Sequence, residues 1–504
     1  MGNKHINHKL RFLMPFLLIL PLFWSCMDLE ETPYDVVTPG EYYQTEGELI
    51  AAVIPVYNSL GLASWDGLTG LQDISSDAMV VPTRGGDWDD GGMWRALQEH
   101  TWTPVHPSIS NAWENAYGGV ARANSTLDAL GRAEQTPLVK TFIAEVKVLR
   151  ALYYWWLMDL FGAVPLVTDP ATDPDNPPSQ STRTEVYNFI VAEITAALPD
   201  LEDTFTAGSY GRVTTGVANT LLATVYLNAE VYTGTAKWTE CVAACNAVIN
   251  SGEYALMPTV ADVFALENEG PGNTENILVV ATLPADGVTA YRHMATLHYN
   301  QIPSSPWNGF AVLSDFYNKY DTDDDRRDQI LAGQAYVLGG PSAGDSAFDR
   351  QGEPLIFTVD FPLFDATEGD GPRVLKWPID PNMSGWFAGN DYAIFRYSHV
   401  LLAKAEAQYM LGNTADALAL VNQVRERAFD PDEALTAVTL DDIFDERGYE
   451  FLWEGFRRQD QIRTGKWLGT WSLHETPSAE YTELYPIPQT QMDANPNLVQ
   501  NPGY

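Results

Sequence analysis

Acidic side chains at regular spacing near residue 450 are the first candidates for catalysis. Glutamates recur every fourth residue there, at Glu446, Glu450 and Glu454. The basic residues among them are Arg447, Arg457, Arg458 and Arg463. A glycosidase needs two carboxylates that face each other across a sugar, usually from different elements. Carboxylates on one helix face lack that geometry and repel each other unless cations neutralise them. The pattern therefore favours a buried Glu/Arg network over catalysis.

A second acidic run imitates the start of a calcium loop. Asp321, Asp323 and Asp325 have the right spacing, but the sixth position is Arg326 instead of Gly and the twelfth is Ala332 instead of Glu. An ordinary charged loop fits better, and calcium binding stays without support. The eight histidines show no metal-binding spacing. We expect no cofactor, no metal and no catalytic residue, since nucleophile-elbow and phosphate-loop motifs are also missing.

Aromatic residues in loop-like segments are the strongest chemical signal. Five of the fifteen tryptophans lie between residues 65 and 113, and glycines around several of them let the backbone expose bulky rings. Other aromatic residues follow at Tyr291, Tyr299 and Trp307, and again at Trp377 and Trp386. Sugars present flat C–H faces ringed by hydroxyls, which aromatic rings cover while Arg, Asp and Asn contact the hydroxyls. The alternative is that these rings pin long loops onto the body of the protein, because large aromatic side chains are usually buried.

For the cluster as a whole, the sequence favours contact with a ligand. The predicted ligand-binding residues are Trp65, Arg84, Asp87, Trp88, Trp94, Tyr291, His293, Trp307 and Asn308.

Composition bounds the possible partners. The 504 residues include 29 basic and 67 acidic ones, which gives a net charge of −38. Such a charge argues against nucleic acid and other anionic partners. It fits uncharged ligands or cations, and it also fits acidity that serves solubility alone. Cys241 and Cys245 share one face of a predicted helix, so they are expected to be small core residues without a disulfide.

The N-terminus has the plan of a secretory signal. Three basic residues precede the apolar run from Phe12 to Phe23, and Ser25 precedes Cys26. We predict a lipoprotein signal peptide over residues 1–25, lipidation of Cys26 and a tether over residues 26–45. An ordinary signal peptide with an incidental Cys26 is the alternative, because Phe23 stands where a lipoprotein signal usually carries Leu.

One buried helix organises the remaining chain. Apolar residues cover every face of residues 137–161, Thr136 is a suitable N-cap, and Gly162 is a suitable stop. Such a helix needs helices packed on both sides. Further helices are expected at residues 46–60, 111–132, 185–198, 215–232, 236–250, 391–411, 414–428 and 439–465.

Two of these helix pairs look alike and have the length of a tetratricopeptide repeat. The pairs turn at Gly234 and Gly412. We predict one domain over residues 46–504, with helical repeats in residues 111–252 and 391–465. Residues 61–110 and 253–390 are rich in Gly, Pro, Asp and aromatic residues, and they are expected to form a loop-rich ligand face with short strands.

Several motifs along the chain resemble those of the SusD/RagB family. The central motif includes Glu145, Leu149, Arg150, Ala151, Tyr153, Tyr154, Phe161, Gly162, Val164, Pro165 and Leu166. Similar motifs occur at Ser251, Gly252 and Tyr254, from Arg396 to Ala407, and from Asn422 to Ala428. The C-terminal signature runs from Ile443 to Gly465, and the ending Pro486-Ile487-Pro488 through Asn501-Pro502-Gly503-Tyr504 is also similar.

This resemblance implies a mainly α fold, a superhelix of four tetratricopeptide-like helix pairs with a large loop-rich insertion. It also implies a lipid-anchored protein exposed on the outer membrane. Such a protein binds oligosaccharide or polysaccharide and delivers it to a SusC-like TonB-dependent transporter without catalysis. The motifs are mostly structural, so the choice of ligand-binding residues depends on their chemistry alone.

Three alternatives remain open from the sequence. The cargo could be a peptide instead of a glycan, and the acidic surface would then favour basic peptides. The chain could be a secreted glycoside hydrolase with scattered carboxylates. It could also be a structural module whose repeats dock a partner, and then changing Trp88, Trp94 and Trp307 to Ala leaves ligand uptake untouched.

Overall fold

A computed structural model describes residues 43, 45–63, 68, 70–171, 173, 175–204, 206–266, 270, 272–283, 285, 292–429 and 433–504. The predicted signal peptide, Cys26 and nearly all of the tether lie outside these residues. In the described part, helices dominate and each strand has two to five residues. The predicted fold class, mainly α with a loop-rich insertion and few short strands, is therefore confirmed.

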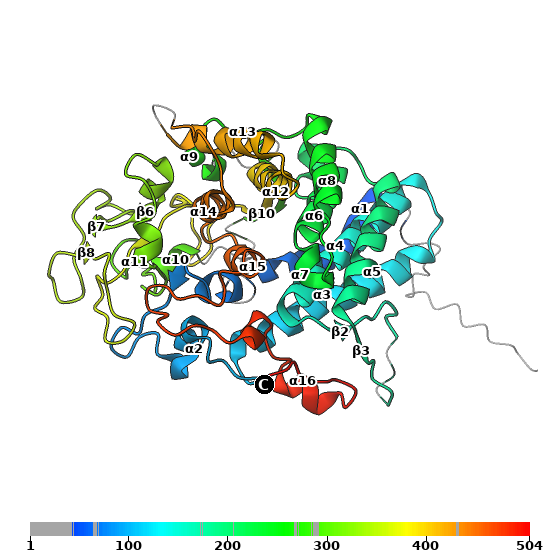
Figure 1. Cartoon of the computed structure of the whole chain (residues 1–504), viewed down its shortest axis with the longest axis horizontal. Helices are drawn as coiled ribbons and strands as arrows, with labels where there is room; N and C mark the ends of the chain where they lie inside the picture. Colours follow the sequence, from blue (N-terminus) through cyan, green and yellow to red (C-terminus); the bar gives the residue numbers. More distant parts are fainter. Residues whose placement is uncertain are drawn as a thin grey trace, which may run out of the picture.

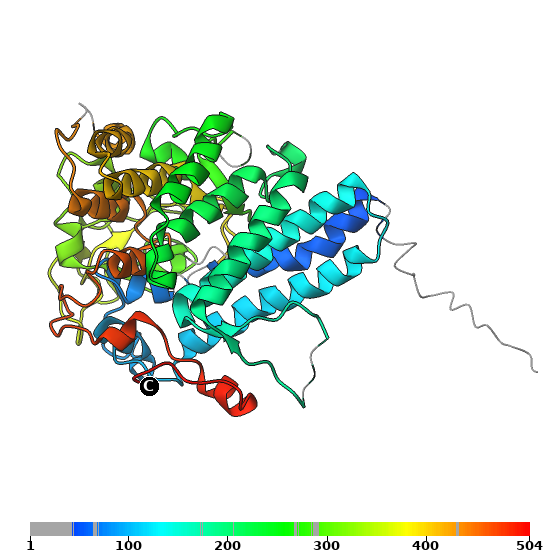
Figure 2. The ribbon, with the colours of Figure 1, turned by 45° about the vertical axis from the view of Figure 1, so that its right-hand side comes forward.

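The long helices form one body in which sequence neighbours pack side by side (Figure 1). They are α1 (Glu46–Asn58), α3 (Pro107–Gly131), α4 (Pro137–Phe161), α5 (Arg183–Ala197), α6 (Thr215–Leu227), α8 (Trp238–Ser251), α12 (Tyr397–Met410), α13 (Thr414–Arg425) and α14 (Leu440–Glu450). Figure 2 shows α3, α4 and α5 running alongside one another at one end of the body. None of the described helices combines the length and the apolar character that a membrane span requires.

Helix α4 is the centre of this arrangement, as predicted. Its N-cap Thr136 accepts a hydrogen bond from the Val139 backbone N–H at 3.3 Å, and Gly162 ends it with φ 74°. Buried side chains occur on all its faces because α3 and α5 pack against it. Tyr153 also touches Gly119 of α3, where a Cβ atom would lie 2.7 Å from its ring. The two glycine turns predicted within the helix pairs also form, and Gly234 and Gly412 both lie in the left-handed region.

The short elements belong mostly to the loop-rich regions. The small helices are α2 (Met93–Glu99), α7 (Ala229–Thr233), α9 (Val260–Phe264), α10 (Arg292–Thr296), α11 (Ser314–Tyr317), α15 (Arg457–Arg463) and α16 (Gln489–Ala494). The antiparallel strand pairs are β1 (Met79–Val80) with β5 (Ala311–Val312), β2 (Val164–Pro165) with β3 (Gln180–Ser181), β4 (Asn276–Val280) with β10 (Tyr392–Arg396), β6 (Ile330–Leu331) with β9 (Arg373–Val374), and β7 (Gly333–Gln334) with β8 (Ile356–Phe357). In Figure 1 the strands β6, β7 and β8 lie at the side of the molecule opposite α3–α5.

Three predicted helices are wrong in extent. Residues 215–232 form two helices, α6 and α7, which are interrupted at Asn228. Residues 391–411 begin as strand β10, which pairs with β4, and become helix α12 only at Tyr397. Residues 439–465 form two helices, because the chain turns between α14 and α15 with Trp453 at φ 61° and Gly455 at φ 83°. Glu454 therefore lies in a turn and not on the helix that carries Glu446 and Glu450.

The three glutamates do lie in a buried Glu/Arg network, as predicted, but their partners are not the arginines nearby in the sequence. Those four arginines pair with other carboxylates: Arg447 with Asp460, Arg457 with Asp77, Arg458 with Asp159 and Arg463 with Glu406. Arg396 binds Glu450 at 2.8 Å and Glu454 at 2.7 Å. Arg326 binds Glu446 at 2.6 Å and Asp324 at 2.8 Å, and Glu275 completes the cluster through Arg396. The cations Lys376 and Arg427 also pair with its carboxylates. Burial alone raises the pKa of Glu450, but the surrounding cations outweigh burial and hold that pKa far below its usual value.

Replacing Arg396 by Met should destabilise the protein strongly, because Glu275, Glu450 and Glu454 would lose their shared cation in a buried site. We expect a loss of about 3–5 kcal/mol in the free energy of unfolding. Denaturant unfolding measures this loss. The matched control is Arg132→Ala, which removes an exposed ion pair with Asp128 and should cost less than about 1 kcal/mol. Equal effects of the two substitutions would contradict a structural role for the network.

Candidate functional site

Loop segments from distant parts of the sequence meet in one region, here called the loop face, which includes residues 79–94, 307–312 and 363–371. The Thr83 backbone N–H donates to the Leu363 carbonyl at 3.0 Å, and the Ala366 N–H donates to the Thr83 carbonyl at 3.0 Å. Strands β1 and β5 join residues 79–80 to residues 311–312. These contacts bring the predicted residues near 84–94 and near 307–308 into one neighbourhood.

The buried side chain of Arg84 joins these segments by hydrogen bonds. Its side chain is 4% exposed and donates to the carbonyls of Asn308 at 2.8 Å and Thr367 at 2.8 Å. Burial lowers the pKa of Arg84 to about 10, so the guanidinium stays charged at neutral pH. A second buried guanidinium, that of Arg373, donates to the Asn308 side-chain oxygen at 2.9 Å and to the Glu368 carbonyl at 3.1 Å. Backbone carbonyls of two segments, residues 308–309 and 367–371, thus converge on two cations.

Trp88 and Asn308 both have left-handed backbone at the centre of this contact, with φ angles of 63° and 54°. Asparagine adopts this region more readily than most residues, but for a tryptophan it is strained. The Trp88 indole N–H donates to the Trp307 carbonyl at 2.7 Å. Its ring lies so close to Gly309 that a Cβ atom there would approach within 2.3 Å. Strain of this kind is typical of functional loops that the surrounding structure holds in place.

Several predicted ligand-binding residues are buried and need a different interpretation. Trp94 is 3% exposed and packs edge-on against Phe310 and Trp88. His293 is 3% exposed and its Nε2 lies 2.9 Å from the Trp377 carbonyl, while Asn308 is fully buried. These side chains leave no open surface, so their predicted direct contact with a ligand is corrected to support of the loops. The physical reason is that long loops need their own apolar and hydrogen-bonded anchors.

The other predicted residues differ in their placement. Asp87, Trp88 and Trp307 are half-buried, so each keeps some open surface. Trp65 and Tyr291 lie outside the described residues, and their predicted role stays a prediction.

One pair of indoles is open to solvent. Trp386 is 51% exposed, and its ring centroid lies 5.5 Å from that of Trp307 with an interplanar angle of 85°. A tight turn with Gly385 at φ 62° and a bridge between Ser384 and Phe387 places Trp386 at the tip. Trp386 is one of the aromatic residues in the loop-like segments, but it is not among the predicted ligand-binding residues. The glycine directly before an aromatic residue was the signal that could have selected it.

A polar crevice of about 610 Å³ opens beside Arg84. The other residues that line it are Gly85, Gly86, Asp87, Asp349, Arg350, Gln351, Pro354, Leu355, Ile356, Ala366, Thr367, Glu368 and Gly369. Carboxylate and guanidinium groups at its wall are suited to pairs of sugar hydroxyls. A ligand that fills this crevice meets groups of both signs, so an uncharged ligand with many hydroxyls fits it best.

Arg350 organises the wall of the crevice. Its guanidinium binds Asp87 at 2.9 Å and Glu368 at 2.5 Å, and it lies 4.1 Å above the ring of Tyr299. The Tyr299 hydroxyl donates to Asp87 at 2.6 Å. His298 Nε2 lies 2.9 Å from Glu368, and because burial lowers the pKa of His298, the neutral imidazole donates that hydrogen bond. These contacts fix Asp87 and Glu368 in place, and both carboxylates have a cation as partner.

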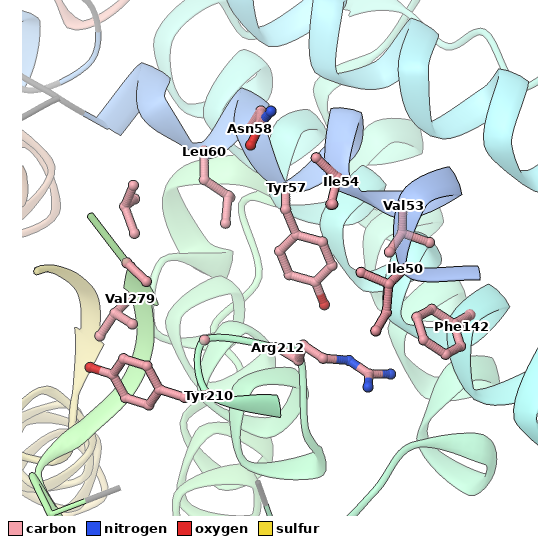
Figure 3. A pocket seen from close by; sticks show the side chains of 13 residues that line it. Ile50, Val53, Ile54, Tyr57, Asn58, Leu60, Phe142, Tyr210, Arg212 and Val279 are labelled. Atoms are coloured by element: carbon pink, nitrogen blue, oxygen red, sulfur yellow. The ribbon is translucent and has the colours of Figure 1, made fainter. Parts of the chain in front are cut away.

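A second cavity, of about 260 Å³, lies beside helix α1 (Figure 3). Its lining is mainly apolar, from Ile50, Ile54, Phe142 and Val279, and Figure 3 shows Tyr57 and Arg212 directed into the same space. The Tyr57 hydroxyl donates to Glu145 at 2.6 Å, and Arg212 also pairs with Glu145. Tyr57, Tyr210 and Arg212 of this cavity already have side-chain partners, and the indoles of the loop face are not among its lining. The loop face is therefore the better candidate for a sugar site.

The described side chains give no support to metal or disulfide chemistry. Within the described ranges, His, Cys, Asp and Glu form no group of three that could hold a metal ion. Asp321, of the calcium-like run, instead accepts the backbone N–H of Asp323 at 3.2 Å in a surface turn. Cys241 and Cys245 are free and buried, as predicted.

Comparison with known proteins adds independent findings. A family model described as the SusD family matches residues 365–504, and one described as "Starch-binding associating with outer membrane" matches residues 80–227. The starch-binding protein SusD of Bacteroides thetaiotaomicron is 26% identical over 95% of this chain and 96% of that protein. The SusD-like protein P25 of Formosa agariphila is 26% identical over 98% of this chain and 100% of that protein. A solved structure of a laminarin-binding SusD-like protein superposes with a TM-score of 0.74 at 25% identity, covering 92% of this chain and 100% of that one.

Arg84 and Arg350 line the same crevice but should differ in their effect on stability. We expect Arg84→Lys to lower the free energy of unfolding by about 1–3 kcal/mol, because buried carbonyls lose their donors. Arg350→Lys should cost less than about 1 kcal/mol, because this side chain is 48% exposed. Denaturant unfolding compares the two variants. A larger loss for Arg350→Lys would contradict the assignment of Arg84 as the internal anchor.

Proposed function

The chain belongs to the SusD/RagB family, and from this premise we propose that it captures an uncharged glycan at the cell surface for uptake. The relative SusD and the laminarin-binding neighbour are named as binding proteins, and one matching family model describes association with the outer membrane. The proposed role is binding without cleavage. The observation that carries it is the open Trp307–Trp386 pair on the same loop face as the polar crevice.

The geometry supports sugar binding in two ways. The exposed face of Trp386 offers apolar area to the C–H face of a sugar ring, and the half-buried Trp307 holds it from the side. Asp87, Arg350 and Glu368 offer acceptors and donors for hydroxyl groups in the crevice. Binding should be modest in strength, because an open platform excludes water incompletely and many hydroxyls stay solvated.

Cleavage of the glycan is not proposed. The glutamates at 446, 450 and 454 are buried in ion pairs, away from the crevice lining. Asp87 and Glu368 both pair with Arg350. Burial alone would raise the pKa of Glu368, but the hydrogen bonds from Arg350 and His298 hold that pKa below its usual value, whereas a general acid needs a raised one. Within the described residues, the loop face holds groups that bind and orient.

The attachment and the transport partner are also proposed. Cys26 would carry a lipid, residues 26–45 would tether the body to the outer membrane, and the chain would deliver its glycan to a SusC-like TonB-dependent transporter. The helical body is the surface we assign to the transporter, because the ligand-binding groups lie on the loop face.

A glycan panel tests the proposed function. Calorimetry with soluble starch and laminarin should give binding to at least one of them by the mature chain. The double variant Trp307→Ala/Trp386→Ala should weaken that binding at least about tenfold, because each ring contributes about 0.5–1.5 kcal/mol beyond its buried area.

The control is Trp238→Ala, a half-buried indole at the start of α8 that should leave the affinity unchanged. Unchanged affinity in the double variant would place the sugar elsewhere. Release of reducing ends during the measurement would point to the hydrolase alternative, and retention of basic peptides instead of glycans to peptide cargo.

Lipidation is tested separately by Cys26→Ser. The wild-type precursor, expressed in a Gram-negative host, should sediment with the membrane fraction and enter the detergent phase on phase separation. The variant should be recovered in the soluble fraction, because without the thiol no lipid is attached. A variant that stays with the membranes would rule out Cys26 as the anchor.

A further inference from the structure

We propose that the outer face of a small three-stranded unit, residues 333–357, is a second glycan-binding surface that holds the extended chain of a polysaccharide beyond the crevice. We call this surface the outer platform. This inference rests on the proposed function, because it assigns a further contact to the same uncharged glycan. It also predicts something the proposed function does not, namely a preference for long chains.

The register of the strands puts the platform side chains on one face. Gln334 pairs with Ile356 across β7 and β8, Tyr336 pairs with Ser346, and Phe348 pairs with Pro354. Antiparallel partners direct their side chains to the same side, and so do residues two apart on one strand. By these two rules, six side chains lie on the same face of the unit: Gln334, Tyr336, Ser346, Phe348, Pro354 and Ile356.

Burial alternates as this register requires. Tyr336 is 50% exposed, Phe348 49% and Ile356 51%. The residue directly before each of them is buried: Ala335, Ala347 and Leu355 form one apolar cluster with Phe357. The unit therefore has an apolar side that faces inward and a second apolar side that faces water. Exposed apolar groups gathered on one face in this way are typical of a binding surface.

The unit is rigid enough to present the platform without a large ordering cost. Three backbone hydrogen bonds of 2.9 Å connect the strands in a closed cycle, from Ala335 N–H to the Leu355 carbonyl, from Leu355 N–H to Ala347, and from Ala347 N–H to Ala335. Gly344 and Gly352, both with positive φ, make the turns.

Side chains of a neighbouring segment anchor the unit from the inner side. The Asn300 amide donates to the Phe348 carbonyl at 2.8 Å, and the Gln301 amide donates to the Tyr336 carbonyl at 3.2 Å. Pre-ordered rings lose little entropy when a ligand covers them.

The platform is continuous with the crevice. Pro354 and Ile356 belong to both, and Asp349, Arg350 and Gln351 join the second strand to the crevice wall. A linear ligand that leaves the crevice past Ile356 meets Phe348 and Tyr336 next. Gln334 and Ser346, both exposed, supply hydrogen-bonding groups between the rings.

The charge around the platform favours an uncharged ligand over a second copy of this chain. Asp345, Asp349 and Glu353 occupy the same three strands and their turns, and the whole chain carries −38. Two such surfaces placed face to face would bring like charges together. A neutral polysaccharide covers the rings without that repulsion.

The experiment compares long and short ligands on one double variant. Affinities of the mature wild type and of Tyr336→Ser/Phe348→Ser are measured for soluble starch and for laminarin, each beside its own tetrasaccharide. We expect the variant to bind the polysaccharide about five- to twentyfold more weakly, with tetrasaccharide affinity changed by less than about twofold. Tyr481→Ser, which removes a 41% exposed ring elsewhere, should leave both affinities unchanged.

The outcomes distinguish failure of the outer platform from failure of the proposed function. Equal affinity of variant and wild type for the polysaccharide overturns the platform and leaves the proposed function standing. Failure of the wild type to bind either polysaccharide overturns both. Loss of concentration-dependent self-association in the variant, with unchanged glycan binding, shows that the face is an interface between copies and also overturns the platform.

A second measurement needs no substitution and does not depend on how the variant folds. Hydrogen exchange of the wild type with saturating polysaccharide should slow at residues 334–336 and 346–348, and the tetrasaccharide should not slow it there. Identical exchange with both ligands would count against the platform.

Discussion

The structure depends on a cluster of buried ion pairs. Any segment that moved away from this cluster would leave a buried charge without a partner. Arg396 stands where strand β10 becomes helix α12, and it holds carboxylates from α14, from the following turn and from the residue before β4. Lys376 and Arg326 bring cations from the loop-rich insertion into the same cluster. Because an unpaired buried charge costs several kcal/mol, helices and insertion must come together before any of these charges is neutralised. The cluster thereby fixes the insertion to the helical body.

Fixing the insertion in this way makes the loop face possible. Loops of this length would otherwise be mobile, and their rings would turn inward. The two buried guanidiniums of Arg84 and Arg373 hold the carbonyls of two segments, residues 308–309 and 367–371, so the loops keep left-handed positions such as that of Trp88. Some rings then act as anchors below the surface, as Trp94 does, while Trp386 stays open above it. Some aromatic side chains therefore support the loops while others stay open to a ligand, although the sequence does not distinguish between them.

Much of the fold could be predicted from the sequence because its signals are local. Thr136, Gly162, Gly234 and Gly412 mark helix ends by their own chemistry, and the apolar faces of α4 require neighbours on every side. The prediction failed where a distant partner decides the conformation. Strand β10 forms because β4 lies beside it, and the turn at Glu454 directs that carboxylate toward Lys376 and Arg396.

The site was predictable as a region but not as a set of contacts. Loops rich in aromatic residues and glycine indicate a candidate region, and the segments near residues 84–94 and 307–308 do lie together. Which ring is open depends on partners far away in the sequence, as with Trp94 beneath Phe310 and Trp88 against Gly309. No spacing rule reveals such contacts. Exposure of a loop side chain is a tertiary property, whereas a helix cap is a local one.

The most direct test of the central claim, capture on rigid loops without bond breaking, is a crystal structure of the mature chain with a bound hexasaccharide of the glycan that the panel selects. The account predicts an intact oligosaccharide with a sugar ring on Trp386 and hydroxyls within hydrogen-bonding distance of the crevice wall. A sugar in the cavity beside α1 with the loop face empty, or a cleaved product in the crevice, would contradict it.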